Sequence, residues 1–229
     1  MNILNWFDIF GIDHIFTKST KDTLPNTTLS NTTLSINTIS TDDSTLSDSF
    51  EKLFADINNI DCYIKQTARN TVIYDGDLET SKILLIGEAP GQEEDRQGKP
   101  FVGQSGILLN NMLQAINLKR SDVIISNIVF WRPPANRTPS SDEISLCLPY
   151  VHRLINLIKP KAILLLGSVA VHSILNTNAP ITKCRGTIKK FQNINTVATY
   201  HPAYLLRSVT QKQLAFKDLI LFSRLLRKS

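Results

Sequence analysis

Long apolar runs are missing from this 229-residue sequence, and cysteine is scarce. No stretch approaches the roughly 20 consecutive apolar residues that a membrane-spanning helix needs, so we expect no membrane association. The first residues lack a basic start and a small-residue cleavage site, which argues against a secretory signal. The three cysteines are far apart and odd in number. They favour a reducing compartment, such as a bacterial cytoplasm, over a disulfide framework.

Two common phosphate-binding signatures are also missing. Five of the nine glycines lie between Gly87 and Gly106, but no Gly-Lys-Ser/Thr follows them and their spacing is not that of a dinucleotide fingerprint. A nucleotide cofactor is therefore disfavoured. Glycines allow a backbone to approach a ligand closely. Four acidic residues between positions 88 and 95 favour a functional loop over a turn that only reverses the chain.

Composition divides the chain into three parts. Residues 1–17 are apolar and predict a short helix, whereas residues 18–48 are rich in Ser, Thr and Asn and predict a disordered linker. Residues 49–229 are expected to form one globular domain. Residues 1–50 have a net charge of −4, which leaves 23 basic against 14 acidic side chains in the remainder. This excess suits a polyanionic partner, and a basic surface kept for solubility explains it equally well.

Short strands and helices alternate from about residue 50 onward. Runs rich in Ile, Leu and Val predict buried strands at residues 82–87, 123–129, 162–167 and 196–200. Helix-like stretches occupy residues 105–116, 141–158, 168–175 and 211–227. This alternation predicts an α/β fold with three layers, helices on both faces of a central four-stranded parallel sheet.

Unusual residues follow three of the four predicted strands. The first strand runs into GEAPG at 87–91, the second into Asn127 and FWRPPANR at 130–137, and the fourth into YHPAYLLR at 200–207. Parallel strands bring their carboxyl ends to one edge of the sheet, where ligands bind in such folds. The three loops are therefore expected to build one site.

The three segments GEAPGQEEDRQGKPFVG, NIVFWRPPANRTP and HPAYLLR together resemble the family 4 branch of the uracil-DNA glycosylase superfamily. The resemblance covers about residues 58 to 225. It implies a base-excision-repair enzyme that hydrolyses the N-glycosidic bond of a uracil flipped out of DNA and leaves an abasic site. The implied partner is uracil-containing DNA, single- or double-stranded, and we expect a monomer.

The resemblance also assigns the residues of a uracil pocket. Phe101 matches the aromatic ring that stacks on the base, Asn127 the amide that reads its edge, and His201 the donor to uracil O2. Gly87 and Ala89 belong to the loop that forms the floor. By position alone, Phe101 could equally be a core side chain and Asn127 a turn cap.

The water-activating group is less well defined. Ala89 stands where the best-known branch of the superfamily has a catalytic Asp, so Glu88 is the candidate for positioning water or the loop. Glu94 and Asn136 match other functionally sensitive family positions and are expected to bond each other across loops, or else to support those loops.

DNA contacts are expected around the same edge. Leu205 and Leu206 follow the histidine motif, a position that predicts exposure and a wedge inserted into the base stack. The alternative is a hydrophobic contact on the last helix, which is expected to bury one of the two leucines. The basic side chains expected to meet phosphates are Lys99, Arg132, Arg137 and Arg207.

Many members of family 4 hold a four-iron–four-sulfur cluster on four cysteines. The matching positions here are Cys62, Lys65, Trp131 and Cys147, so only two of the four are cysteine. Such clusters need a full thiolate set or histidine substitutes. We therefore predict no cluster and no other cofactor, with Cys62 and Cys147 as remnants and Trp131 filling the vacated volume.

Two alternatives to uracil excision stay open. One is a glycosylase of broader range that also removes deaminated bases such as hypoxanthine. The other is a non-catalytic DNA-binding or polymerase-associated module on the same fold. Retention of Phe101, Asn127 and His201 counts against the second alternative.

Overall fold

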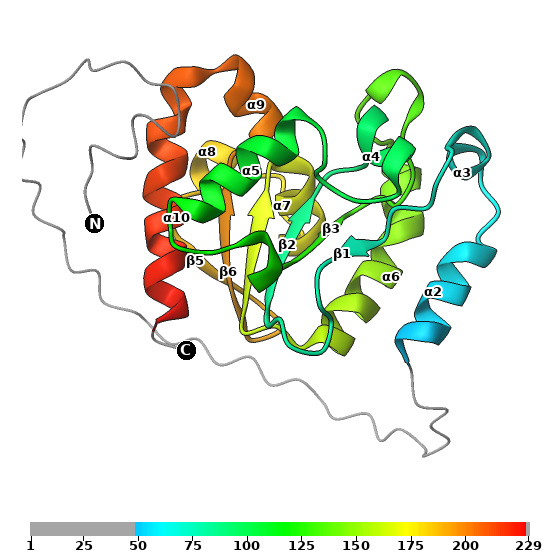
Figure 1. Ribbon diagram of the computed structural model, residues 1–229, viewed down its shortest axis with the longest axis horizontal. Coiled ribbons are helices and arrows are strands. Elements are labelled where there is room, and N and C mark those ends of the chain that lie inside the picture. The colour runs from blue at the N-terminus through cyan, green and yellow to red at the C-terminus, as the bar shows by residue number, and fades with distance from the viewer. Residues whose placement is uncertain (1–48, 228–229) are drawn as a thin grey trace, which may run out of the picture.

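A six-stranded sheet forms the centre of the computed structural model, which describes residues 49–227 (Figure 1). The helix predicted at 1–17 and the linker predicted at 18–48 lie outside the described residues. The strand order is β1-β3-β2-β4-β6-β5. The strands are β1 (Tyr74–Asp75), β2 (Ile83–Gly87), β3 (Ile124–Asn127), β4 (Ala162–Leu166), β5 (Ile188–Phe191) and β6 (Ile194–Thr199).

The four middle strands are those predicted from the sequence. They pair in parallel, which confirms the predicted core of the sheet. The two edge strands, β1 and β5, pair antiparallel with β3 and β6 and were not predicted. The sheet of the described domain therefore has six strands instead of four.

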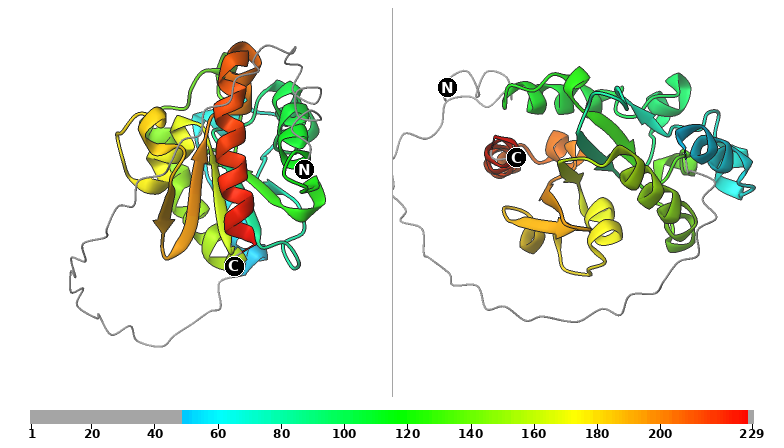
Figure 2. Two further views of the ribbon diagram at one scale, coloured as in Figure 1. Left: turned by 90° about the vertical axis from the view of Figure 1, so that its left-hand side faces the viewer. Right: turned by 90° about the horizontal axis from the view of Figure 1, so that it is seen from below.

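Helices cover both faces of this sheet, and Figure 2 shows the resulting three layers. The α-helices are α2 (Phe50–Asn59), α3 (Tyr63–Thr67), α4 (Gln92–Gln97), α5 (Gln104–Gln114), α6 (Ser141–Ile158), α7 (Ser168–Leu175), α8 (Ile181–Cys184), α9 (Pro202–Arg207) and α10 (Lys212–Leu226). Three short 3-10 turns, η1 (Arg120–Asp122), η2 (Pro134–Asn136) and η3 (Val209–Gln211), complete the connections. None of the described helices is both long and apolar enough to cross a membrane.

Two apolar clusters separate the layers. Side chains alternate between the faces of a strand, so Leu84 and Ile86 pack with α2, α6 and α7, whereas Leu85 packs with α5 and α10. Both clusters are almost completely excluded from solvent. The middle strands are consequently apolar on both faces, which is why they read as continuous apolar runs in the sequence.

Helix α6 begins and ends at the residues predicted for it. The Ser140 hydroxyl accepts from the backbone N–H of Glu143, and the Glu143 carboxylate accepts from the backbone N–H of Ser140, at 3.2 and 2.8 Å. This capping box fixes the first turn. The left-handed conformation of Lys159, just before Pro160, ends the helix.

Candidate active site

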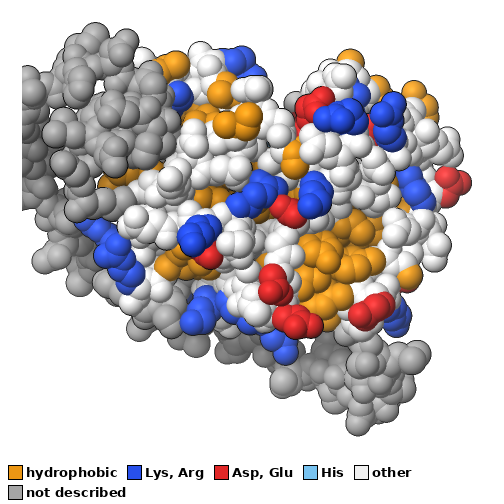
Figure 3. Space-filling model, in the orientation of Figure 1, with side chains coloured by type: hydrophobic (Ala, Val, Ile, Leu, Met, Phe, Trp, Pro, Cys, Tyr) orange, Lys and Arg blue, Asp and Glu red, His pale blue; other side chains and the backbone are white. Residues whose placement is uncertain are grey.

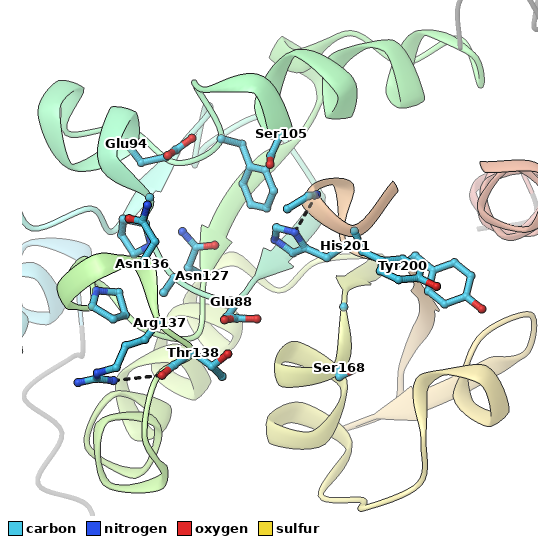
Figure 4. A pocket seen from close by; sticks show the side chains of 18 of the residues that line it. Glu88, Glu94, Ser105, Asn127, Asn136, Arg137, Thr138, Ser168, Tyr200 and His201 are labelled. Carbon is cyan, nitrogen blue, oxygen red and sulfur yellow. Dashed lines mark hydrogen bonds between the residues drawn. The ribbon is translucent and has the colours of Figure 1, made fainter. Parts of the chain in front are cut away.

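The loops that follow β2, β3 and β6 meet around a cavity of about 720 Å³ at the carboxyl edge of the sheet (Figure 4). Nine of the predicted site residues line it: Glu88, Ala89, Glu94, Phe101, Asn127, Asn136, Arg137, His201 and Arg207. Several further lining residues were not predicted, among them Ser105, Thr138, Ser168, Ile181 and Tyr200. The side chains of Asn127, His201 and Glu88 converge on one space in Figure 4.

Gly87 forms the floor because no larger residue fits there. In the β2–β3 register it lies opposite Asn127. A Cβ at this position would come within 2.5 Å of both Asn127 Oδ1 and the Phe101 ring. The absence of a side chain at Gly87 is therefore what allows the amide and the ring to share one pocket.

Phe101 is held in an unusual backbone conformation. Its φ of 51° lies in the left-handed region, which bulky residues rarely adopt. Gly106 accommodates this turn, since a Cβ there would come 1.9 Å from the carbonyl oxygen of Phe101. The ring itself is buried and lies 5.4 Å from the ring of His201, centroid to centroid.

Arg120 fixes this loop and was missed in the sequence. Its guanidinium donates to the carbonyl oxygens of Pro100 and Phe101 at 2.7 and 2.8 Å. It also donates to Asp75 Oδ2 at 2.8 Å and, more weakly, to the side-chain oxygen of Asn110 at 3.3 Å. The Arg120 guanidinium thus has four acceptors and holds the strained loop, although Pro100 and Phe101 lie about 20 positions earlier in the chain.

Asn127 carries a buried acceptor that no described residue satisfies. Its side chain is 1% exposed, and Oδ1 has no hydrogen-bond partner among residues 49–227. A buried amide oxygen left unpaired costs about 1–3 kcal/mol, so such atoms normally have a partner. Asn127 lines the cavity, so a donor bound there is placed to pair with Oδ1.

The tautomer of His201 follows from its own backbone contact. Nδ1 accepts from the backbone N–H of Ala203 at 3.1 Å, which caps helix α9 and places the proton of the neutral ring on Nε2. Burial, with a smaller effect from Arg207, lowers the pKa of His201 to about 4. The ring is therefore a neutral donor at physiological pH.

Glu88 presents a carboxylate that has no hydrogen-bond or ion-pair partner among residues 49–227. Its backbone carbonyl accepts from Val129, which extends the strand pairing past Gly87, while the side chain lines the cavity. Burial raises the pKa of Glu88 above its ordinary value of 4.5. A carboxylate that is partly desolvated and not hydrogen-bonded is well suited to accept a proton.

Glu94 and Asn136 do not bond each other, which corrects that expectation. Glu94 Oε1 instead accepts from the backbone N–H groups of Val102 and Gly103, both at 2.9 Å. Asn136 Oδ1 accepts from Arg132 Nε at 2.7 Å. Each side chain thus holds its own loop, one on either side of the cavity.

The two leucines differ in exposure, in line with the expectation that one of them is packed inside, and Leu205 is thereby excluded from the predicted DNA contacts. Leu205 is fully buried in the cluster beneath α5 and α10 and cannot reach a base step. Leu206 is 43% exposed. Leu205 points inward because α9 is a helix, and successive residues of a helix face different directions.

The predicted phosphate-binding side chains surround the cavity unevenly. Arg137 and Arg207 line it, although Arg137 also forms a two-bond pair with Glu143 at 2.6 and 2.8 Å. Arg132 does not line the cavity but donates to Asn136, which does. Lys99 is well exposed and lies 4.0 Å from Asp75.

Two of the four positions matched to a metal cluster, Trp131 and Lys65, form hydrogen bonds instead, and Cys62 and Cys147 are free thiols. Trp131 is fully buried, and its indole N–H donates to Thr71 Oγ1 at 3.0 Å. Lys65 donates to the carbonyl oxygens of Asn58 and Ile60. Cys147 is fully buried, and this burial raises the pKa of its thiol to about 12. In residues 49–227 no three His, Cys, Asp or Glu side chains are grouped to hold a metal ion. The residues present do not fit a cluster.

Comparison with known proteins shows which family this chain resembles over most of its length. A family model described as the uracil DNA glycosylase superfamily matches residues 73–222. The type-4 uracil-DNA glycosylase of Pyrobaculum aerophilum is 35% identical over 181 residues, which cover 75% of this chain and 92% of that protein. The type-4 enzyme of Thermotoga maritima is 39% identical over 149 residues, covering 64% of this chain and 77% of that protein. The type-4 enzyme of Sulfurisphaera tokodaii is 38% identical over 181 residues, covering 75% and 82%.

Proposed function

This chain belongs to the uracil-DNA glycosylase superfamily, and we propose that it hydrolyses the N-glycosidic bond of a uracil flipped out of DNA. The observation that carries the proposal is the unpaired, buried Oδ1 of Asn127 in the cavity wall. An amide oxygen accepts from uracil N3–H while the amide nitrogen donates to uracil O4. Cytosine presents the opposite pattern at these two positions and would leave both groups unpaired.

Phe101 and His201 supply the remaining contacts to the base. The ring of Phe101 offers a stacking surface, which contributes about 1–3 kcal/mol per base. The Nε2–H of neutral His201 donates to uracil O2, where negative charge grows as the base leaves. Because the donor is already oriented by the Ala203 contact, this stabilisation requires no rearrangement during the reaction.

Glu88 positions the water that attacks the sugar. The sugar gains oxocarbenium character as the bond to uracil lengthens, and a nearby carboxylate stabilises that positive charge. The same carboxylate accepts a proton from the attacking water. Ala89, which follows Glu88, has no group for this purpose, so Glu88 is the acid of this loop that we assign to the reaction.

DNA would approach the edge that carries α9. Leu206 is the exposed apolar side chain that we assign to the base step vacated by the flipped uracil. Arg137 and Arg207 at the cavity mouth are assigned to phosphates. The basic excess of the domain favours this encounter at long range.

We also propose that the enzyme works without an iron–sulfur cluster. Trp131 and Lys65 occupy two of the four matched positions with satisfied hydrogen bonds of their own. Purified protein is expected to contain no stoichiometric iron and to keep its thermal midpoint in the presence of a chelator. Iron bound at four atoms per chain would overturn this part of the proposal.

An excision assay on oligonucleotides that contain one uracil tests the proposed reaction. Wild-type protein should release uracil and leave an alkali-sensitive site, and Asn127→Ala or His201→Ala should lower kcat/KM by about 10²–10³. A parallel assay on an oligonucleotide that contains hypoxanthine tests whether the enzyme also removes other deaminated bases. Binding to the uracil oligonucleotide without any release would overturn the proposal and favour a non-catalytic module.

A further inference from the structure

A second, smaller cavity of about 120 Å³ lies beside the first and is dominated by arginine. Its walls are formed by Arg69, Gln92, Asp95, Arg96 and Arg132. The three arginines come from three separate segments, which are the stretch after α3, helix α4 and the loop after β3. We call these three residues the arginine site.

Two of the three guanidinium groups have donors to spare. The Nε–H of Arg132 donates to Asn136 Oδ1, and no residue among 49–227 accepts from its two terminal nitrogens. The guanidinium of Arg69 likewise has none there, because only its backbone N–H is engaged. Arg96 pairs with Glu93 at 2.7 Å, but both side chains are about half exposed, so that pair is weak and exchangeable.

The acid in the wall does not neutralise this site. Asp95 is buried, and its Oδ1 accepts from the backbone N–H groups of Arg69 and Asn70 at 2.8 and 3.0 Å. Through these bonds Asp95 fixes the backbone conformation at Arg69. Three guanidiniums against Asp95 and Glu93 leave one positive charge in excess, with planar donors that match a tetrahedral anion.

The arginine site adjoins the first cavity. Asn136, which binds Arg132, lines the first cavity, and Gln92 of the arginine site follows Gly91, which also lines it. Figure 3 shows basic and acidic side chains gathered over the α4 end of the molecule, next to this edge. An anion held by the arginine site would therefore sit beside whatever occupies the pocket.

We infer that the arginine site binds a backbone phosphate of the DNA strand, next to the nucleotide whose base enters the pocket. This inference rests on the proposed function. It adds a fixed anchor at the side of the pocket opposite α9, so that the strand is held on both sides of the flipped nucleotide. Such an anchor sets the register of the strand and carries no sequence preference.

The test neutralises phosphates one at a time. Uracil oligonucleotides that each carry one methylphosphonate at a successive position are compared by apparent KM, with wild-type protein and with Arg69→Gln/Arg132→Gln. One flanking position should raise the KM of the wild type about tenfold and leave the KM of the double variant unchanged. The double variant should also lower the slope of log K against log salt by about 1–2.

Lys189→Gln/Lys190→Gln on the exposed edge strand β5 is the matched control, since it removes the same charge far from the arginine site. If the double variant unfolds, the exposed Arg96→Gln and the single Arg132→Gln provide the same comparison. The inference would be overturned if a methylphosphonate raised the KM of the variants as much as that of the wild type. It would also be overturned if the salt slope of the variants changed no more than that of the control. Competition by inorganic phosphate without any position-specific penalty would also overturn it, because it indicates a free-anion site. Uracil release by the wild type in these assays reports on the proposed function separately.

Discussion

At the scale of single residues, the pocket combines a carboxylate and an imidazole whose pKa values are shifted in opposite directions by the same cause. Burial raises the pKa of Glu88 above 4.5 and lowers the pKa of His201 to about 4. Both shifts favour the neutral form, as desolvation requires. His201 therefore stays neutral through the range in which Glu88 takes up a proton.

This ordering predicts the pH dependence of excision. Because the role proposed for Glu88 requires its carboxylate form, the rate should fall as the pH drops through its raised pKa, giving an acidic limb above pH 4.5. Glu88→Gln should lower the rate by about 10²–10⁴ and remove that limb. Single-turnover excision between pH 4.5 and 8 measures both effects. The same limb in Glu88→Gln would assign it to another group.

Arg120 is expected to act on the reaction through Phe101. Arg120→Ala frees the carbonyl oxygens of Pro100 and Phe101, so the strained loop should relax and the stacking surface should be lost. We expect kcat/KM to fall about 10–100-fold, in line with the 1–3 kcal/mol of one stack. In a Phe101→Ala background, Arg120→Ala should have little further effect.

The control for this prediction is Arg153→Ala, which breaks a comparable ion pair with Asp56 at 2.8 Å on α6 and α2. It should leave kcat/KM within a factor of about two, since surface pairs contribute little. Equal losses for Arg120→Ala in the presence and absence of the Phe101 ring would contradict the positioning role and indicate a general loss of stability.

Sequence reasoning found the residues of the pocket more readily than the residues that hold them. Phe101, Asn127 and His201 were identified because they match the motifs of the family that the sequence resembles, whereas position alone left Phe101 and Asn127 open to a structural reading. Arg120 follows a lysine in a polar stretch and has no local signal of its own. Its role depends on contacts with residues about 20 positions earlier, and such contacts exist only in the folded chain.

At the scale of elements, the predictions succeeded where burial leaves a periodic signal. Strands β2, β3, β4 and β6 and helices α6 and α7 fall at their predicted positions. Strand β1 has only two residues, and β5 is mostly exposed with two lysines, so neither shows an apolar run. Helix α4, with the sequence QEEDRQ, is short and polar and ends at Gly98 in the left-handed conformation, so it shows no apolar period. Edge strands and one-turn helices depend on neighbours that local sequence does not reveal.

A buried ion pair joins three of these elements and gives a prediction at this scale. Asp218 on α10 is fully buried and accepts from Arg185 at 2.7 and 2.9 Å and from the hydroxyl of Thr199, at the end of β6, at 2.9 Å. Asp218→Ala leaves Arg185 buried without its partner. The free energy of unfolding should fall by about 3–5 kcal/mol.

Urea denaturation measures this loss, with Asp56→Ala as the exposed counterpart. Breaking the surface pair of Asp56 should change the free energy of unfolding by about 0–1 kcal/mol. A loss below about 1 kcal/mol for Asp218→Ala would mean that water replaces the carboxylate and that the network is not buried in solution.

At the scale of the whole molecule, the pocket depends on the register of the sheet. Its main groups arrive from β2, β3 and β6, and although β6 is distant from the other two in the chain, all three lie within four neighbouring strands of the sheet. A slip of one residue between β2 and β3 would separate Gly87 from Asn127 and exchange the side chains that the two apolar clusters receive. The two apolar clusters that fix this register therefore also fix the site.

All of these parts lie between residues 49 and 227, which leads to the last prediction. A fragment that begins at Ser49 keeps the hydroxyl that accepts from Lys52 at the start of α2. It also keeps every residue that lines the pocket. We expect its free energy of unfolding to match the full chain within about 1 kcal/mol, as for changes away from a core. Its kcat/KM at moderate salt should agree within a factor of about three.

Low salt should nevertheless distinguish the fragment from the full chain. Residues 1–48 carry two lysines and six aspartates, so their removal raises the net charge from +5 to +9. The fragment should bind DNA more tightly below about 50 mM salt, and the difference should disappear as screening shortens the range of the added charge. A fragment that is destabilised by more than about 2 kcal/mol would instead show that the first 48 residues complete the domain, because deletions outside a folded unit do not cost that much. Tighter binding without loss of stability would place the domain boundary at Ser49, as its composition predicts.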